Sequence, residues 1–331
     1  MSDTPAISVI VPVYKGVRFL REALDSVRAQ TFQDWECVCV DDGAKDGSGA
    51  LADRLAEEDR RIRVIHQANG GTSVARNTAL SVVRGKYVAF LDEDDIYHPR
   101  FLEVLHDIIV RTGADIAGCE RMKFAEETHP VFAEEAPSAG ALRIADRPGI
   151  AALAADYYQG IPFEIWRNLY RTDLVREHSF PPGVRVEQDL YWLYTLLPKI
   201  SSFALTDWIG YAWRESSIGG YLHPDPESLI SLTRTCRIIL DTVPDGLSMT
   251  ADQRRQLALS MANSLKWNIR RPLIHGLQLS REESVRLRDG LRALQIRGAD
   301  ICRAGLRWHQ TLRWRLFLST GLRLWKTRAL R

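Results

Sequence analysis

The stretch KYVAFLDEDD at residues 86–95 decides which fold the sequence favours. Its first half is apolar and β-prone, which indicates a buried strand. The strand then ends in four adjacent carboxylates, Asp92 to Asp95. Like charges this close repel one another unless water solvates them or a cation lies among them. A solvated strand end and a divalent-cation site are therefore the two interpretations to be separated.

Short apolar strands alternate with amphipathic helices on both sides of this stretch. Unbroken apolar strands alternating with helices are typical of a sheet that is covered by helices on both faces and whose strands are mostly parallel. The sequence therefore predicts an α/β fold, a mostly parallel sheet flanked by helices. The expected strands are 7–14, 36–42, 62–67, 86–90 and 114–119, and the expected helices are 19–30, 49–59, one from residue 73, and 99–113.

The charge changes sign along the chain. Residues 250–331 hold 18 Lys and Arg against 5 Asp and Glu, whereas residues 1–249 hold 26 against 37. An acidic front and a basic, helix-prone tail indicate two different tasks. We expect three regions, 1–125, 126–235 and 236–331, of which the last is a basic helical extension.

The overall composition is that of a soluble globular protein. Of 331 residues, 45% are hydrophobic and 26% are charged. No apolar run approaches 18 residues and the N-terminus has no basic leader, so neither a membrane span nor a signal peptide is expected. Five cysteines without a zinc-site spacing favour a reducing compartment over a disulfide framework. We expect a cytoplasmic protein.

Distinctive residues follow the predicted strands at their carboxyl ends, where open α/β sheets bind ligands. The first strand ends in PVY (12–14), the second in DDG (41–43) and the fourth in DEDD (92–95). The helix after the third strand begins with NGGTSVARN (69–77). Because these segments share one edge of the sheet, they predict a single site. No GxGxxG follows the first strand, which argues against a dinucleotide-binding site.

These motifs, in this order, resemble those of family 2 glycosyltransferases with the GT-A fold. The resemblance is carried by SVIVPVYKG (8–16), VDDGAKDGS (40–48), NGGTSVARN and FLDEDD, and more loosely by residues 166–192 and 211–220. It implies an inverting transfer of a sugar from a nucleotide-diphosphate donor, with UDP as the expected nucleotide and Mn²⁺ or Mg²⁺ as the cofactor. Residues 1–125 would then bind the donor, and 126–235 would form the acceptor side.

The resemblance also assigns residues to the donor. Asp94 is expected to bind the metal directly, and Asp92 to face the metal through water or to face the ribose. In an extended segment both point away from Glu93. Carboxylate oxygens suit either cation. The other expected donor contacts are Pro12, Tyr14 and Asp42 at the nucleotide base, Arg76 at the base or the phosphates, and Arg214 over the phosphates. The alternatives are a core aromatic for Tyr14, a surface arginine for Arg76 and a structural loop for Arg214.

An inverting transferase needs a base that takes the proton from the attacking acceptor hydroxyl. The segment VEQDLYW (186–192) resembles the family segment that supplies this carboxylate, which makes Asp189 the expected base and Glu187 the second candidate. Gln188 departs from the family pattern, where a glutamate is usual, and Asp189 as a mere helix cap is the alternative. Asn168 departs from a family lysine, and Trp166 is either an acceptor platform or a core residue.

The tail at 303–331 combines arginines with tryptophans and carries no acidic residue. This composition suits the surface of an anionic membrane, and a protein-binding or self-packing helix is the alternative. We therefore expect a cytoplasmic enzyme, peripheral to the inner face of the membrane, that acts in polysaccharide or glycolipid synthesis on a saccharide or lipid-linked acceptor. No nucleic-acid motif is present, and an oligomer stays open. The alternative functions are a sugar nucleotidyltransferase and a non-catalytic subunit that binds nucleotide sugars.

Overall fold

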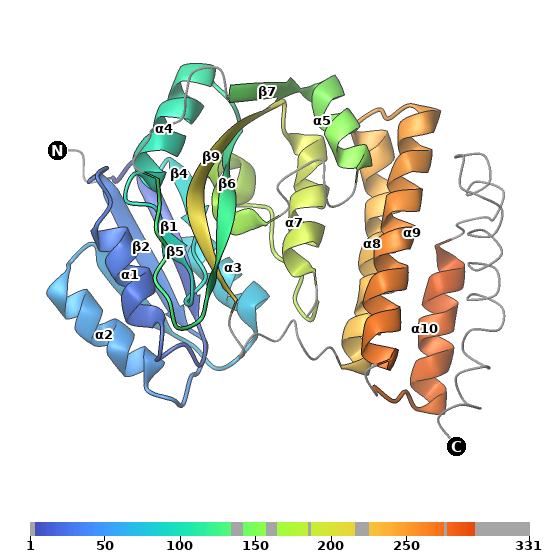
Figure 1. Ribbon diagram of the computed structural model, residues 1–331, viewed down its shortest axis with the longest axis horizontal. Helices are drawn as coiled ribbons and strands as arrows, with labels where there is room; N and C mark the ends of the chain where they lie inside the picture. Colours follow the sequence, from blue (N-terminus) through green and yellow to red (C-terminus); the bar gives the residue numbers. More distant parts are fainter. Residues whose placement is uncertain are drawn as a thin grey trace. The chain divides into compact units, whose positions relative to one another are not determined.

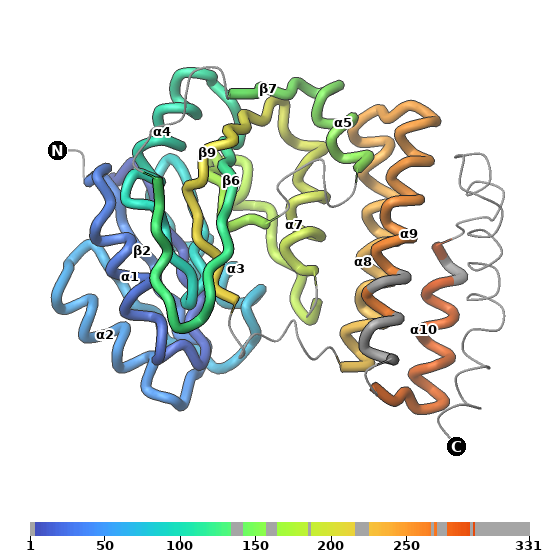
Figure 2. Tube along the Cα trace, viewed as in Figure 1, coloured from blue at the N-terminus to red at the C-terminus, as the bar shows by residue number. Residues whose placement is uncertain are grey.

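The computed structural model describes residues 4–133, 142–156, 164–184, 187–215, 225–274 and 277–294. The chain divides into two compact units, which are described separately (Figures 1 and 2). The first comprises residues 1–150, 162–183 and 188–219, and the second comprises 151–161, 184–187 and 220–331. The basic tail at 303–331 and the serines that follow Glu215 lie outside the described residues.

A nine-stranded sheet forms the centre of the first unit, in the order β3-β2-β1-β4-β8-β6-β9-β5, with β7 paired to β9. Strands β3, β2, β1 and β4 are parallel neighbours. The predicted α/β class, a central sheet flanked by helices, is confirmed. The strands are β1 Ile7–Val13, β2 Trp35–Asp41, β3 Ile62–His66, β4 Tyr87–Phe90, β5 Ile96–Tyr97, β6 Ile116–Ala125, β7 Leu142–Asp146, β8 Asn168–Arg171 and β9 Ser202–Glu215.

Strand β8 lies between β4 and β6 and is antiparallel to both. The alternating pattern did not include it, because four residues are too short for a periodic signature. Its Leu169 and Tyr170 are fully buried, so the strand is stabilised by what it packs against. The insertion brings the chain back to the middle of the sheet just before the segment that carries Asp189.

Helices cover both faces of this sheet. Helix α3 packs on β1 and β2, and α4 packs on β6, β8 and β9 (Figure 1). Gly113 ends α4 at φ 66°, a left-handed conformation that favours glycine. The helices of the first unit are α1 Leu20–Arg28, α2 Ser48–Glu58, α3 Thr72–Val82, α4 Phe101–Thr112, α6 Thr172–Val175 and α7 Gln188–Leu196, and α5 Arg147–Ala155 crosses the boundary between the units.

An aromatic cluster joins β4 to the elements that follow β8. The ring of Phe90 contacts those of Tyr170, Phe180 and Trp192 at centroid distances of 5.8, 5.6 and 5.6 Å. Phe180 and Trp192 stack at 4.5 Å. Large buried rings dominate core energetics. The cluster therefore places the start of α7 close to the carboxyl end of β4, where the four acids begin.

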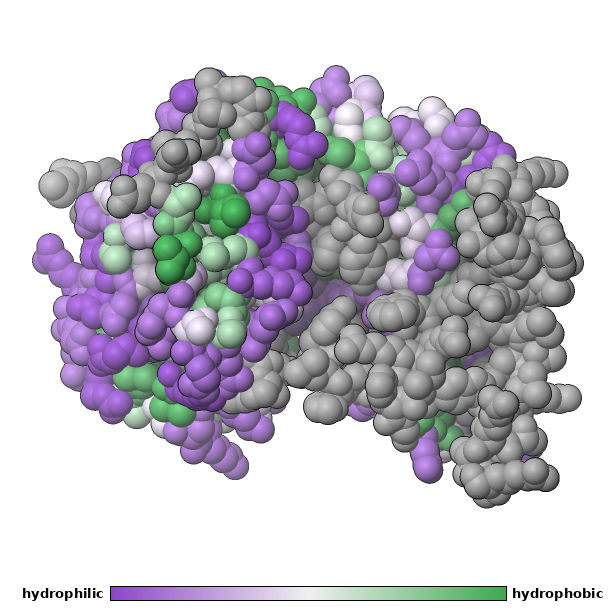
Figure 3. Space-filling model, in the orientation of Figure 1, coloured by the Kyte–Doolittle hydropathy of each residue, from purple (hydrophilic) through white to green (hydrophobic). Residues whose placement is uncertain are grey.

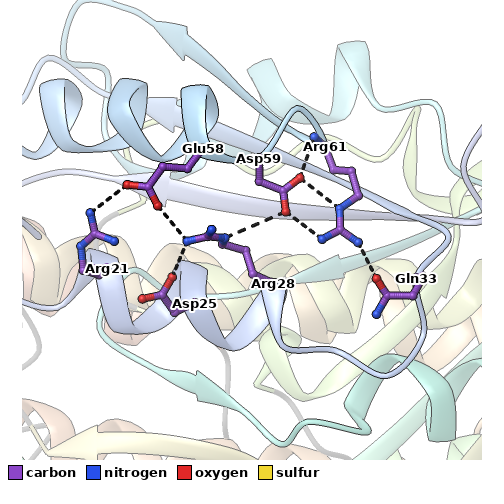
Figure 4. Close-up of polar contacts among 7 residues, drawn as sticks. All are labelled: Arg21, Asp25, Arg28, Gln33, Glu58, Asp59 and Arg61. Carbon is purple, nitrogen blue, oxygen red and sulfur yellow. Dashed lines mark hydrogen bonds and ion pairs between the residues drawn. The ribbon is translucent and has the colours of Figure 1, made fainter.

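A surface network of ion pairs ties α1 to the end of α2 (Figure 4). Arg28 contacts Asp25 at 2.9 Å and Glu58 at 3.0 Å. Arg61 binds Asp59 through two nitrogen–oxygen pairs, at 3.0 and 2.7 Å. The guanidinium of Arg61 also stacks 3.8 Å from the ring centroid of the buried Trp35. The network lies at the amino ends of β2 and β3, away from the carboxyl ends of the strands, which lead to the acids.

The second unit is built around three helices, α8 Pro226–Gly246, α9 Ala251–Ile274 and α10 Arg281–Ala293. Asp225 caps α8 by accepting a hydrogen bond from Ser228 N at 2.7 Å. Helix α8 packs against both α9 and α10. None of the helices among the described residues combines the length and the hydropathy that a membrane crossing requires.

Hydrophilic residues predominate over the coloured surface of the first unit on the face drawn in Figure 3. Hydrophobic residues gather there only in small groups. The large hydrophobic side chains that remain exposed among the described residues are Tyr14, Val17, Val110, Val131, Ile144, Ile209 and Val285. Tyr14 is the member of this set that the sequence assigns to a site.

Candidate active site

The carboxyl ends of β1, β2 and β4 meet at one edge of the sheet. In the parallel register, Val13 pairs with Asp41, and Ile10 pairs with Phe90. The segments that follow therefore leave the sheet side by side. The structure thus brings together the loops after the first, second and fourth strands, as the sequence predicts.

The four acids after β4 turn in different directions. Glu93 is directed to the loop after β1, where its carboxylate accepts a hydrogen bond from Tyr14 N at 2.9 Å. A Cβ atom at Gly16 would lie 2.0 Å from Glu93 Oε2, so this contact requires glycine. Burial raises the pKa of Glu93 to about 8, with the like charges of Asp94 and Asp92 adding to it. Glu93 therefore joins two loops and is separated from its neighbours.

Asp95 is buried and bonds to β9. It accepts hydrogen bonds from the hydroxyl of Tyr211 at 2.7 Å and from Arg214 N at 2.8 Å. Burial raises the pKa of Asp95 well above its usual range, and the like charges of Asp94 and Asp92 raise it further. Asp95 therefore ties the segment after β4 to a side chain and to the backbone of β9.

Arg214 occupies a closed environment of main-chain acceptors. Its guanidinium donates to Asp94 O at 2.7 Å, to Glu126 O at 2.9 Å and to Glu22 Oε2 at 2.7 Å. It also lies between the rings of Phe19 and Phe124, at 4.3 and 4.5 Å. The side chain is 2% exposed. Because each nitrogen of the guanidinium has an acceptor inside the protein, this geometry favours a structural role for Arg214 over the expected phosphate contact.

Arg76 lies between two carboxylates of the site. Its Nη2 donates to Asp92 Oδ1 at 2.8 Å, and its Nη1 donates to Asp189 Oδ1. The side chain of Arg76 is 2% exposed, whereas Asp92 and Asp189 keep 30% and 22% of theirs exposed. Burial disfavours the charge of Arg76, but Asp189 and Asp92 outweigh it and raise the pKa of the guanidinium. The alternative of a surface arginine for Arg76 is therefore wrong.

Asp189 is the predicted base, and it lies in the first turn of α7. Burial raises the pKa of Asp189 to about 6, although the charge of Arg76 opposes this shift. Gln188 beside it accepts a hydrogen bond from Ser73 Oγ at 2.7 Å. This bond gives the glutamine a structural role. Glu187 bonds to Asn268 of α9 within the second unit, at 3.0 Å.

Asp42 holds the loop that precedes α3. Its two carboxylate oxygens accept hydrogen bonds from Gln67 Nε2, Gly70 N and Gly71 N at 2.7, 2.8 and 2.7 Å. The residue is 2% exposed. Asp42 thus uses its acceptors inside the protein, which favours a brace for the loop over the expected contact with a nucleotide base. Gly71 adopts φ 87°, which the tight loop requires.

The remaining predicted residues divide between exposed and core positions. Tyr14 is 42% exposed at the end of β1, and Pro12 is buried within that strand, opposite Val40. Trp166 stacks on Tyr211 at 4.1 Å and is 6% exposed, which favours a core role over an acceptor platform. Asn168 is fully buried and donates to the hydroxyl of Tyr170 at 3.0 Å, so it also belongs to the core.

Comparison with known sequences places this arrangement in a family. The sequence profile described as glycosyl transferase family 2 matches residues 8–178, more than half of the chain. The chain belongs to glycosyl transferase family 2. The match includes the acids after β4 and the NGGTSVARN segment, and it ends before Asp189.

Two relatives of this family 2 chain show how far the sequence similarity extends. It is 33% identical over 215 residues to the uncharacterized glycosyltransferase EpsJ of Bacillus subtilis, covering 64% of this chain and 62% of that protein. It is 32% identical over 200 residues to the uncharacterized glycosyltransferase YibD of Escherichia coli, covering 58% and 56%. The matched region therefore spans less than two thirds of either relative.

Solved structures share the fold of this family 2 chain. S. aureus TarS 1–349 in complex with UDP-GlcNAc aligns with a TM-score of 0.68 and 19% identity, over 89% of this chain and 82% of that one. The mannosyltransferase PcManGT from Pyrobaculum calidifontis, in complex with GDP-Man and Mn²⁺, aligns with a TM-score of 0.56 and 16% identity, over 98% and 88%. At these identities the likeness establishes the GT-A fold alone, as the sequence predicts.

Two contacts of the site were not predicted from the sequence. The bond from Tyr211 to Asp95 and the enclosure of Arg214 both depend on β9, which pairs with β5 right after the four acids. The YAWR segment indicated that these residues matter but not what they contact. Among the described residues, no group of three or more His, Cys, Asp or Glu side chains is arranged to hold a metal by itself.

Proposed function

We propose that the chain transfers a sugar, with inversion, from a nucleotide-diphosphate donor to a saccharide or glycolipid acceptor. The observation that carries this proposal is the pair of partly exposed carboxylates, Asp92 and Asp189, held together by Arg76 at the carboxyl edge of a family 2 sheet. UDP is the nucleotide we favour, since the TarS structures contain UDP or UDP-GlcNAc. Residues 1–125 would hold the donor and 126–235 the acceptor.

Asp189 is the base in this proposal. It takes the proton from the acceptor hydroxyl as that oxygen attacks the anomeric carbon of the donor, and the nucleoside diphosphate departs on the opposite side. With a pKa of about 6, Asp189 is ionised at neutral pH and is a stronger base than an ordinary aspartate. One displacement of this kind inverts the configuration of the anomeric carbon.

The acids after β4 are suitable ligands for a divalent cation whose remaining ligands are the phosphates of the bound donor. Mg²⁺ sites of this type use one or two carboxylates and complete the coordination with substrate phosphates. Asp94, with Asp92, would supply those carboxylates, while Glu93 and Asp95 are engaged elsewhere. A metal site with these ligands needs no third carboxylate from the protein, because phosphate oxygens complete the coordination. Bound there, Mn²⁺ or Mg²⁺ would neutralise charge that develops on the diphosphate leaving group.

Tyr14 remains the proposed contact of the nucleotide base, whereas Pro12, buried within β1, would support the end of that strand. Tyr14 is exposed at the end of β1, beside the loop that Glu93 holds, and its ring is free to lie against a flat base on the side away from Lys15 Nζ, which sits 5.1 Å from the ring centroid. Stacking of a base on an aromatic ring stabilises a complex by about 1–3 kcal/mol.

The decisive experiment measures release of UDP from UDP-GlcNAc and other UDP-sugars, with and without Mn²⁺, in the presence of saccharide acceptors. Asp189→Asn should lower transfer by about 10²–10⁴-fold while UDP still raises the melting temperature. The matched control is Asp173→Asn, an exposed acid paired with Arg171, which should leave transfer unchanged. Full turnover in the Asp189→Asn enzyme would reject this residue as the base.

A further inference from the structure

One face of helix α3 binds the segment that leads to the proposed base. Ser73, Arg76 and Asn77 are three and four residues apart, so they share that face. Ser73 donates to Gln188 at 2.7 Å, and Arg76 donates to Asp189. Asn77 donates to Phe180 O at 2.9 Å and accepts from Phe180 N at 2.7 Å. These three contacts hold Phe180, Gln188 and Asp189 against one face of α3, which is called the α3 mount below.

The other end of this mount is attached to the sheet edge. The loop before α3 is bonded to Asp42 through Gly70 N and Gly71 N, and α3 itself packs on β1 and β2. Helix α3 is therefore linked by hydrogen bonds to the end of β2, through Asp42, and to the start of α7, through Gln188 and Asp189. A displacement of α3 would move Asp189 relative to Asp92.

The burial of Arg76 decides how it can act. With 2% of its side chain exposed, the guanidinium offers almost no surface to a ligand, whereas both of its carboxylate partners reach solvent. It lies over the ring of the buried Phe180, 5.3 Å from the centroid. A buried cation between two ionised acids offsets their mutual repulsion and fixes their separation.

We propose that Arg76 is a positioning residue that acts through Asp189, rather than a contact of the donor. It orients the carboxylate of Asp189 for proton removal and holds it at a set distance from Asp92, with Ser73 and Asn77 fixing the same segment. The NGGTSVARN motif then lies in the region proposed to bind the donor, but it positions the base that acts on the acceptor hydroxyl. This inference rests on the proposed role of Asp189 as the base.

The test separates turnover from donor binding. Arg76→Lys keeps the charge, but a single ammonium cannot reproduce the planar fork that reaches two carboxylates. With UDP-GlcNAc as donor, we expect kcat to fall 10- to 100-fold while the KM for the donor and the Kd for UDP change less than twofold. A rise in the Kd for UDP as large as the fall in kcat would overturn the proposal, since it would make Arg76 a donor contact.

Two further sets of variants make the result specific. Ser73→Ala and Asn77→Ala should each lower kcat three- to tenfold with an unchanged Kd for UDP, because they loosen the same mount without touching the charge of Arg76. Unchanged kcat in both would overturn the mount. The matched control, Arg84→Lys, alters an arginine that pairs with Glu36 at the far end of the strands and should change kcat less than twofold.

The inference and the proposed function fail in different ways. Full turnover in Asp189→Asn rejects the base itself. An inactive Asp189→Asn enzyme together with a fully active, folded Arg76→Lys enzyme rejects only the positioning role. Melting temperatures of all variants show that each is folded, and Ser73→Ala with Asn77→Ala decides the question if Arg76→Lys does not fold.

Discussion

Two buried arginines flank the four acids after β4, and their surroundings differ. Arg76 and Arg214 are each 2% exposed. Arg76 is bound by two carboxylates that themselves reach solvent, Asp92 and Asp189. The guanidinium of Arg214 is bound by the main-chain oxygens of Asp94 and Glu126 and by the carboxylate of Glu22, and it lies between two phenylalanine rings.

The difference teaches that the burial of a cation does not reveal its role. The guanidinium of Arg214 binds main-chain carbonyls, a carboxylate outside the proposed site and two aromatic rings, but no side chain with a proposed role in the reaction. We therefore expect it to stabilise the loop whose backbone it binds. A guanidinium held by two partly exposed carboxylates controls the position and charge of groups that can react. Arg214 should therefore act on stability, and Arg76 on turnover.

The largest effect is expected from Arg214→Ala, which tests the stability side of the comparison. Removing this side chain leaves the main-chain oxygens of Asp94 and Glu126 and the partly exposed carboxylate of Glu22 without this donor, and each hydrogen bond of a charged group contributes about 1.5–3 kcal/mol. Urea unfolding monitored by tryptophan fluorescence measures the loss. If the variant kept wild-type stability but lost affinity for UDP, the result would instead support a contact between Arg214 and the donor phosphates.

Asp94→Asn tests whether the side chain of Asp94 binds the cation. Arg214 donates to the main-chain oxygen of this residue. If Asp94 holds the cation, the substitution should remove stimulation by Mn²⁺ and lower transfer at least about 10²-fold, since metal stabilisation of a leaving group is worth several kcal/mol. Titration of Mn²⁺ against activity is the measurement, with Asp107→Asn on the outer face of α4 as the control. Wild-type stimulation by Mn²⁺ in the Asp94 variant would refute the assignment.

The pH dependence of turnover probes the cluster around Arg76. Because burial raises the pKa of Asp189 to about 6, kcat should fall about tenfold per pH unit below 6, as the base becomes protonated. The sign for stability is opposite. An acid whose folded pKa lies above its unfolded value, near 4, destabilises the fold at neutral pH. This cost begins to decrease as the pH falls below about 6 and is gone only below about 4, where the folded and unfolded states are both protonated.

Steady-state rates with saturating UDP-GlcNAc between pH 5 and 8 provide the measurement. The Kd for UDP over the same range serves as the control for donor binding. A rate that stays constant down to pH 5 would exclude Asp189 as the titrating base.

The smallest effect is expected from Arg61→Ala, an arginine outside both clusters. It loses the two-pronged bond to Asp59 and the stacking on Trp35, together about 1–2 kcal/mol, and activity should not change. Thermal melting should show a decrease of about 2–6 °C. Arg61→Lys, which keeps the charge, should lose less. A loss equal to that of Arg214→Ala would remove the distinction between surface and buried arginines.

Much of the fold was accessible from the sequence because its strands are apolar and its helices are amphipathic. The strands at 7–14, 36–42, 62–67 and 86–90 correspond to β1, β2, β3 and β4. Strand β8 was not accessible, because its four residues are stabilised by β4 and β6 on either side. Cys37 and Cys39 pack in the core, as expected of small hydrophobic residues.

The sequence by itself determined the family and the grouping of acids at one edge of a sheet, because periodicity and strand-end motifs are local properties of the chain. Only the tertiary structure decided which acids face solvent and which partners the arginines have. Arg76 meets Asp189 across 113 positions, and Arg214 meets Glu22 across 192. Such contacts depend on how strands and helices pack, so the same residue type becomes a part of the reactive site in one place and a structural brace in another.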